Sequence, residues 1–239
     1  MDAYLQQAGL HEFADDLFRN IVSLKESQDL FDDLSSDPQD QLLAVAAELA
    51  SKPAGYGEAP LIHRPFEEAD YLSAIQWPFE HWSQSRYSNG RFGVWYGALD
   101  WQTTIHETLF HWRHGFLADC GFDRGTAPVV AERKLYRVRC EALLLDLRRL
   151  CKNHPGRFDG DSYQETQAAG ARLSQQGHPG LLSRSARCAG DVAVLFTPKV
   201  LSSPRPFCFL RYVLAPACGR VKVFRGGEQI LDCPSPGAD

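Results

Sequence analysis

Apolar residues recur at spacings of three and four near the start of the chain. The series consists of Leu10, Phe13, Leu17, Ile21 and Leu24. This spacing would place the side chains on one face of a helix, so the segment is predicted to form an amphipathic helix. A second helix is predicted from Asp37, because Asp followed by Pro38 is a favourable N-cap with proline at the first helical position.

A linker is predicted after these two helices. Residues 52–60, KPAGYGEAP, contain two prolines and two glycines, which interrupt any regular pattern. We therefore predict an N-terminal helical appendage over residues 1–55 and a second domain over residues 56–239.

The pattern beyond the linker favours a mixed α+β fold. Short apolar or alternating runs predict strands at residues 61–64, 93–98, 180–187, 191–197, 207–214 and 220–225, and one or two strands within residues 129–147. Two longer segments predict helices. One covers residues 101–114, with Asp100 as its N-cap and Gly115 as its terminator, and the other runs from Asp161 to the residue before Gly177.

Composition excludes several classes of protein. The chain has 239 residues, of which 44% are hydrophobic and 23% charged, values typical of a folded globular protein. A net charge of −5 argues against nucleic acid as the main partner. The first residues are acidic where a signal peptide needs a basic start, and no segment is apolar for long enough to span a bilayer. We expect a cytoplasmic protein with no membrane contact.

No metal site and no common nucleotide motif are expected. The seven cysteines are scattered without a C-x-x-C pair. His106-Glu107 and His111 nearly match the H-E-x-x-H motif, but these histidines are five residues apart and would lie roughly 140° apart around a helix. The sequence also lacks G-x-G-x-x-G and G-x-x-x-x-G-K-[ST], so any nucleotide would have to be bound in another way.

Three polar residues in the middle of the chain have ordinary structural explanations when taken singly. Arg86 lies in a turn, Tyr96 in a short strand, and Glu107 on the helix face opposite the apolar stripe. That stripe consists of Trp101, Ile105, Leu109 and Trp112. A surface arginine, a strand aromatic and a solvated glutamate would all fit these positions.

In combination, three blocks of sequence resemble the RES-domain family. The first is SRYSNGRFGVWYGALDWQTTIHETLFH over residues 85–111, with an Arg-aromatic turn, a strand tyrosine and a helix ending in Thr-x-x-x-Glu. The second is GLLSRSARCAGDVAVLF over residues 180–196, with the pattern Gly-x-x-x-x-Ser-x-Arg. The third is LIHR over residues 61–64, similar to the strand that bears the family's first arginine. The resemblance covers about residues 60–215.

The resemblance implies a fold similar to ADP-ribosyltransferases, with split β-sheets and flanking helices. It also implies a toxin that cleaves NAD⁺ by phosphorolysis to nicotinamide and ADP-ribose-1″-phosphate, with an Xre-type antitoxin as partner. By position, Glu107, Arg64 and Ser185 would be catalytic, and Arg64, Arg86, Tyr96 and Ser185 would bind NAD⁺.

These residue types suit NAD⁺ independently of the resemblance. Arginines can bind the pyrophosphate, and a tyrosine face can stack on the cationic nicotinamide ring. A carboxylate can stabilise the positive charge that develops on the ribose, and a serine hydroxyl can both donate and accept hydrogen bonds. Nicotinamide is neutral once it has left, so the reaction needs no general acid.

Two other functions remain open on the sequence. The chain could be a protein ADP-ribosyltransferase on the same fold, or a non-catalytic protein that binds a partner through its N-terminal region. The apolar stripe of residues 10–24 could pack on its own domain, which we favour, or form a homodimer contact.

Overall fold

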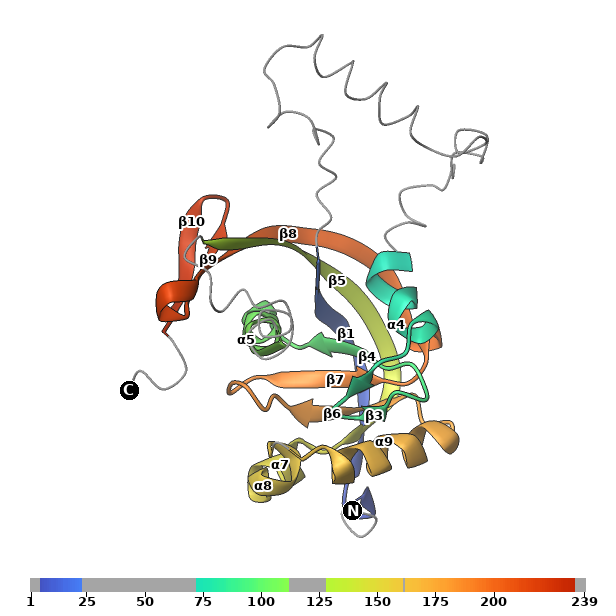
Figure 1. Ribbon diagram of the computed structural model, residues 1–239. Helices are drawn as coiled ribbons and strands as arrows, with labels where there is room; N and C mark the ends of the chain where they lie inside the picture. Colours follow the sequence, from blue (N-terminus) through green and yellow to red (C-terminus); the bar gives the residue numbers. More distant parts are fainter. Residues whose placement is uncertain (1–4, 23–71, 112–127, 161, 235–239) are drawn as a thin grey trace, which may run out of the picture. The chain divides into compact units, whose positions relative to one another are not determined.

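The computed structural model describes residues 5–22, 72–111, 128–160 and 162–234. Its strands are β1 (Gly9–Val22), β2 (Gln84–Ser85), β3 (Ser88–Asn89), β4 (Trp95–Ala98), β5 (Val129–Asp146), β6 (Gly180–Arg184), β7 (Asp191–Leu195), β8 (Leu201–Ala215), β9 (Arg220–Arg225) and β10 (Glu228–Cys233). Its α-helices are α4 (Trp77–Glu80), α5 (Trp101–His111), α7 (Arg148–Asn153), α8 (Pro155–Phe158) and α9 (Gln164–Gln175). A π-helical turn (Leu72–Gln76) and two 3₁₀ turns (Pro198–Val200 and Pro216–Cys218) complete the set (Figure 1).

The long strand β5 organises the main sheet. One edge of β5 pairs antiparallel with β1 from Arg133 to Asp146. The other edge pairs antiparallel with β8 over its first part and parallel with β6 at its end. Because β1 also pairs with β4, β4 with β7 and β7 with β6, these strands close into a ring with β5. Strands β8, β9 and β10 continue from β5 as a separate arm (Figure 1).

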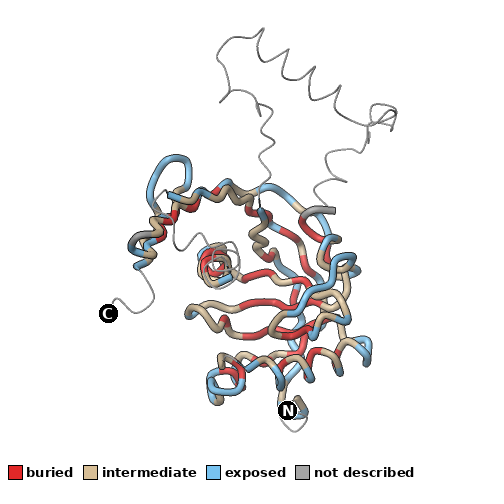
Figure 2. The backbone as a smooth tube through the Cα atoms, in the orientation of Figure 1, coloured by how far each residue is buried: buried red, intermediate tan, exposed pale blue. Residues whose placement is uncertain are grey.

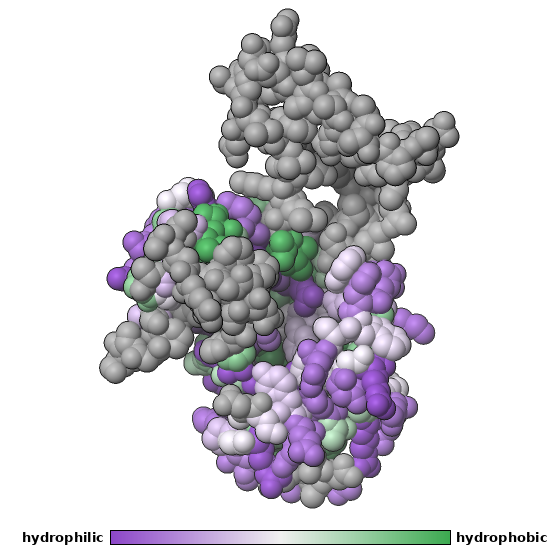
Figure 3. Space-filling model, in the orientation of Figure 1, coloured by the Kyte–Doolittle hydropathy of each residue, from purple (hydrophilic) through white to green (hydrophobic). Residues whose placement is uncertain are grey.

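The helices cover the two parts of this sheet separately. Ile105 and Leu109 of α5 pack with buried side chains of β5, β8 and β9, so α5 lies under the arm. Leu173 of α9 and Leu150 of α7 pack against the ring strands β6 and β7. The face of the molecule over α9 is mostly hydrophilic (Figure 3), and exposed residues gather at the turn between β9 and β10 (Figure 2).

The predicted helix over the first apolar series is wrong for residues 9–22, which form strand β1. Phe13, Leu17 and Ile21 are four residues apart, and a spacing of four fits both one face of a helix and one face of a strand. Leu10, which supported the helical period, is 59% exposed. The strand prevails because its backbone is paired with β5 along its whole length.

Most elements predicted beyond the linker are confirmed. Residues 129–147 form the single strand β5, and the later strands match β6, β7, β8 and β9. Asp100 caps α5 as predicted, because its Oδ1 accepts a hydrogen bond of 2.7 Å from the Thr103 amide. Helix α9 begins at Gln164, later than predicted, and Gly177 follows it with a φ of +75°. Strand β10 was not predicted.

Several predictions lie outside the described residues. They concern the remaining residues of the N-terminal helical region, the linker at 52–60, the strand at 61–64 with Arg64, Trp112 and Gly115. Within the described part of the chain, the mixed α+β class with a large sheet is confirmed. None of the helices described there is long and apolar enough to cross a membrane.

The strand and the helix make opposite predictions for two leucines in β1. A helical stripe would use Leu10 and Leu17 alike, whereas the strand buries Leu17 completely and leaves Leu10 exposed. We expect Leu17→Ala to lower the free energy of unfolding by about 2–5 kcal/mol and Leu10→Ala to change it by less than about 0.5 kcal/mol. Urea unfolding followed by circular dichroism measures both. Similar losses in the two variants would contradict the strand.

Candidate functional site

A cavity of about 840 Å³ lies among α5, the strands β1, β4 and β5, and the β2–β3 hairpin. Its volume is in the range of small-molecule and cofactor pockets. Among the residues that line it are Glu107, Arg86, Tyr96 and Arg187. The cavity therefore contains three of the five residues that the sequence predicted for the site. Ser185 contacts one of them, and Arg64 lies outside the described residues.

Ser185 holds the carboxylate of Glu107. The Ser185 hydroxyl donates a 2.6 Å hydrogen bond to Glu107 Oε1, although the two residues are 78 positions apart in the sequence. The same hydroxyl oxygen accepts bonds from the amides of Arg187 at 3.0 Å and Cys188 at 3.3 Å. One donor and two acceptor positions are all that a hydroxyl offers, so Ser185 orients Glu107 and keeps little capacity for a ligand.

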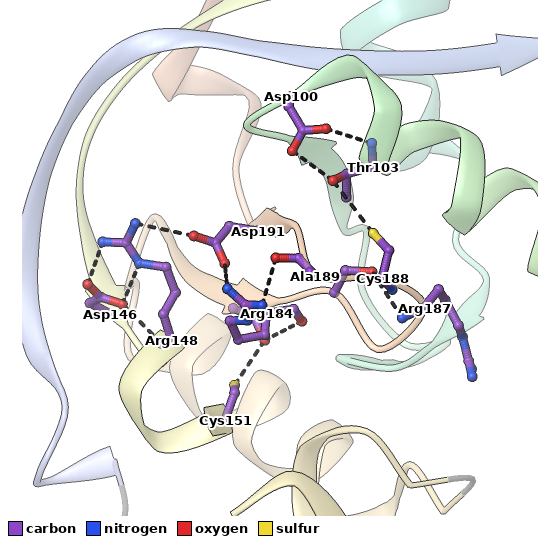
Figure 4. Close-up of polar contacts among 12 residues, drawn as sticks. Asp100, Thr103, Asp146, Arg148, Cys151, Arg184, Arg187, Cys188, Ala189 and Asp191 are labelled. Atoms are coloured by element: carbon purple, nitrogen blue, oxygen red, sulfur yellow. Dashed lines mark hydrogen bonds and ion pairs between the residues drawn. The ribbon is translucent and has the colours of Figure 1, made fainter. Parts of the chain in front are cut away.

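The turn that carries Ser185 can approach α5 because it contains a glycine. A Cβ atom at Gly190 would lie 1.7 Å from Thr103 Oγ1, so no side chain fits there. Thr103 is fixed by Asp100 at the start of α5, and the Cys188 thiol contacts the Thr103 hydroxyl at 3.6 Å (Figure 4). Helix α5 and the β6–β7 turn are therefore in close contact, and this contact holds Glu107 and Ser185 near each other.

Arg86 is held at the turn of the β2–β3 hairpin. One terminal nitrogen, Nη1, donates to the carbonyl oxygens of Phe158 and Gly160, and the guanidinium lies over the ring of Tyr163 at 4.5 Å from its centroid. The other terminal nitrogen, Nη2, is buried, and no described residue accepts a hydrogen bond from it. Arg86 is thus a fixed cation at the cavity wall, and its buried Nη2 has no acceptor among the described residues.

Tyr96 supports the hairpin that carries Arg86. Its hydroxyl accepts a 3.0 Å bond from the amide of Tyr87 and lies 2.9 Å from the hydroxyl of Ser85. Burial raises the pKa of Tyr96 to about 12, although these hydrogen bonds lower it in part. The phenol is therefore neutral at physiological pH. Tyr96 lines the cavity, and its hydroxyl is already bonded within the hairpin.

The cavity is rich in arginines that lack an acidic partner. Arg19, Arg86, Arg133 and Arg187 line it, and none forms an ion pair with a carboxylate of the described residues. Two other arginines behave differently: Arg184 and Arg148 both pair with Asp191 (Figure 4). Positive charge therefore exceeds the negative charge of Glu107 and Glu132, the two carboxylates that line the cavity, and this excess favours an anionic ligand.

His111 responds to this charge. Desolvation lowers its pKa, Glu107 raises it, and the positive charges of Arg187, Arg86 and Arg133 each lower it further. Arginines from three separate parts of the chain thus act on one point at the end of α5. In the described part of the chain, no three histidine, cysteine, aspartate or glutamate side chains are grouped so that they could hold a metal ion.

The sequence did not point to Arg19, Arg133, Arg187 and Tyr163 as site residues. Arg187 belongs to the Ser-x-Arg pattern of the second block, which was the one available signal. Its guanidinium lies over the ring of Phe110, and Nη2 donates to the Tyr163 hydroxyl at 3.2 Å. Arg19 was missed because residues 9–22 were predicted as a helix. Arg133 was missed because it lies in a strand with many charged residues, where no single one stands out.

Taken together, a mixed α+β fold and a cavity with one oriented glutamate among arginines define a candidate small-molecule site for an anion. A family model described as RES domain matches residues 61–215. Because this match covers more than half of the sequence, the chain belongs to the RES-domain family.

One similar solved structure is a chain from the crystal structure of the M. tuberculosis MbcT–MbcA toxin–antitoxin complex, with 13% sequence identity and a TM-score of 0.41. The alignment covers 90% of this chain and 92% of that chain. No curated protein matches the sequence.

The buried tyrosines predict a loss of stability at alkaline pH. Burial raises the pKa of Tyr96 and Tyr212 to about 12, whereas an unfolded tyrosine ionises near pH 10. Between about pH 10 and 12 the unfolded chain therefore binds fewer protons than the folded one, and the free energy of unfolding falls as pH rises.

Replacement of Tyr212 tests whether its raised pKa contributes to this loss of stability. We expect the slope of unfolding free energy against pH in Tyr212→Phe to be shallower than in the unchanged protein by up to about 1.4 kcal/mol per pH unit. Urea unfolding between pH 9 and 11.5, with tyrosinate absorbance recorded in parallel, measures it. An unchanged slope would show that Tyr212 ionises normally in the folded protein.

Proposed function

We propose that this protein is the toxin of a toxin–antitoxin pair and that it cleaves the bond between nicotinamide and ribose in NAD⁺. The observation that carries the proposal is the oriented carboxylate of Glu107 in a cavity lined by arginines without acidic partners. NAD⁺ has the matching features: a pyrophosphate for the arginines, and a ribose that becomes positively charged as its bond to nicotinamide breaks. Membership of the RES-domain family supports the same reaction.

The reaction we propose is phosphorolysis. The bond between the ribose C1 carbon and the nicotinamide nitrogen breaks, and its electron pair neutralises the pyridinium ring. An oxygen of inorganic phosphate then forms a bond to the same carbon, giving ADP-ribose-1″-phosphate. Glu107 stabilises the charge on the ribose during this exchange, and no proton has to reach the leaving group. Phosphate is thus a co-substrate, and no metal takes part in the proposed reaction.

The roles that we propose for the other site residues follow from their positions and contacts. Arg86 supplies a fixed positive charge at the cavity for a phosphate of NAD⁺. The Tyr96 ring forms the surface on which the nicotinamide stacks, because its hydroxyl is already bonded within the hairpin. Ser185 acts through Glu107 as a positioning residue. Arg64 is assigned to NAD⁺ binding and catalysis on the family pattern alone.

The proposal also covers how the toxin is neutralised and how its N-terminal region is arranged. An Xre-type antitoxin would neutralise the toxin by blocking the cavity, as the family resemblance implies. The similarity to ADP-ribosyltransferases belongs to the same proposal, and so does a helical region in the remaining N-terminal residues up to 55, which would pack on the domain or form a homodimer. Transfer of ADP-ribose to a protein is the second candidate reaction, because the acceptor depends on the rim of the cavity more than on Glu107.

One assay separates these functions. The purified protein is incubated with NAD⁺, with and without inorganic phosphate, and the products are identified by mass spectrometry. Free nicotinamide with a phosphate-dependent sugar phosphate supports phosphorolysis. Free ADP-ribose indicates hydrolysis, and ADP-ribose attached to protein indicates a transferase. NAD⁺ that stays intact in every condition would overturn the proposed reaction in favour of a non-catalytic partner-binding protein.

The role of Glu107 predicts the effect of its replacement. Glu107→Gln keeps the shape of the side chain and removes the charge, so turnover should fall by about 10²-fold or more while the protein stays folded. Glu141→Gln is the matched control, because Glu141 is exposed on β5 and pairs with Arg139 outside the cavity. Equal activity in Glu107→Gln and the control would remove Glu107 from the catalytic role.

A further inference from the structure

Two arginines line the part of the cavity formed by β1 and β5. Arg19 comes from β1 and Arg133 from β5. Arg19 Nη1 donates a 2.7 Å hydrogen bond to the carbonyl oxygen of Tyr96. Arg133 donates from Nε to the Asn20 side-chain oxygen at 2.9 Å and from Nη2 to the Asn20 carbonyl at 3.0 Å. Both guanidinium groups are therefore fixed by neutral acceptors.

Asn20 is itself held in place, so Arg133 has a rigid support. The Asn20 amide nitrogen lies 3.0 Å from the hydroxyl of Tyr212 and 3.4 Å from that of Thr104. These contacts tie β1 to α5 and β8. The position of Arg133 is consequently set by three elements, and it does not depend on a flexible surface side chain.

Neither arginine has an acidic partner among the described residues. The second carboxylate that lines the cavity, Glu132, lies 3.7 Å from Arg211. Glu107 is bonded to Ser185. Both arginines are half-buried, and the positive charge of Arg133 acts on Arg19. Two such cations without a counter-charge are unfavourable, unless an anion binds beside them.

The pKa values of Arg19 and Arg133 agree with two cations that lack a counter-charge. Burial, together with the positive charge of Arg133, lowers the pKa of Arg19 to about 10. Burial also lowers the pKa of Arg133. A bound anion would relieve the repulsion between the two cations.

We propose that Arg19 and Arg133 form a second phosphate-binding subsite in the cavity, separate from Arg86 on the β2–β3 hairpin. A phosphate group suits the pair because its oxygens accept several charge-assisted hydrogen bonds from guanidinium groups. Within the proposed function, that phosphate is either the inorganic co-substrate or a phosphoryl group of NAD⁺. The identity of the ligand rests on the proposed function, whereas phosphate binding by these arginines does not.

Binding of inorganic phosphate tests the subsite without any reaction. Thermal unfolding of the full chain is measured in increasing phosphate, with chloride balancing the ionic strength. A ligand of the folded state raises the melting temperature, and we expect Arg133→Gln to weaken the apparent affinity for phosphate about tenfold or more. Arg205→Gln is the control, since Arg205 is exposed on β8 and pairs with Asp16. Equal affinity in Arg133→Gln and the control would overturn the subsite.

A measurement on the unchanged protein covers the case in which Arg133→Gln does not fold. The arginine Nε–H signals in nitrogen-15 NMR spectra report hydrogen bonding at single side chains. Addition of phosphate should shift the Nε–H signals of Arg19 and Arg133, and leave that of Arg205 unchanged. A spectrum in which the signals of Arg19 and Arg133 do not respond would contradict the proposal.

Kinetics then identify the source of the phosphate. If the subsite binds the co-substrate, Arg133→Gln raises the KM for phosphate and leaves the KM for NAD⁺ nearly unchanged; if it binds the dinucleotide, the KM for NAD⁺ rises instead. Either result supports the subsite, and no change in either KM or in kcat would refute it. Phosphate binding that depends on Arg133, in a protein that leaves NAD⁺ intact, would refute the proposed function and keep the subsite.

Discussion

The pairing of β1 with β5 is the interaction on which the cavity depends. This ladder runs from Gly9 opposite Asp146 to Val22 opposite Arg133 without a break. It closes the ring of strands, because β1 also pairs with β4. It also brings Asn20 into hydrogen-bond contact with Arg133, and Asn20 connects the ladder to Tyr212. Without β1, the cavity would lose one wall and two of its polar groups.

The second constraint is the close contact between α5 and the β6–β7 turn. The Asp100 cap sets the start of the helix, and Gly190 leaves room for Thr103. These two contacts place Glu107 within reach of Ser185. The serine of this chain then has an architectural role, because its hydroxyl links a strand turn to a helix side chain. Such a link keeps the carboxylate oriented before a ligand arrives, which is what electrostatic stabilisation requires.

The sequence was informative where a local rule decided the structure. Asp100 as N-cap and the alternation in residues 129–147 gave a helix and a strand that the structure confirms. The prediction from sequence failed at β1. The spacing between Phe13, Leu17 and Ile21 fits both a helix and a strand, and only pairing with the distant strand β5 decides between them.

The arginines of the site likewise depend on contacts between distant segments, which the local sequence does not reveal. Nothing near Arg19 or Arg133 in the sequence reveals that they are half-buried without acidic partners among the described residues. The position of Arg86 depends on carbonyl groups of Phe158 and Gly160, more than seventy residues away. A family pattern can identify such residues, but the contacts that fix them come from the tertiary fold.

The β1–β5 ladder has a consequence for how the protein is made. Its paired residues are more than a hundred positions apart in the chain, and such non-local contacts form slowly during folding. During synthesis, β1 leaves the ribosome first and has an unpaired edge until β5 follows, about 5 to 20 s later at typical rates of about 5–20 residues per second. An unpaired edge of this kind is a site for chaperone binding or for misassembly. The arginines of β1 and β5 meet only after most of the chain has been translated, so a ribosome-bound fragment that stops before β5 cannot build the cavity.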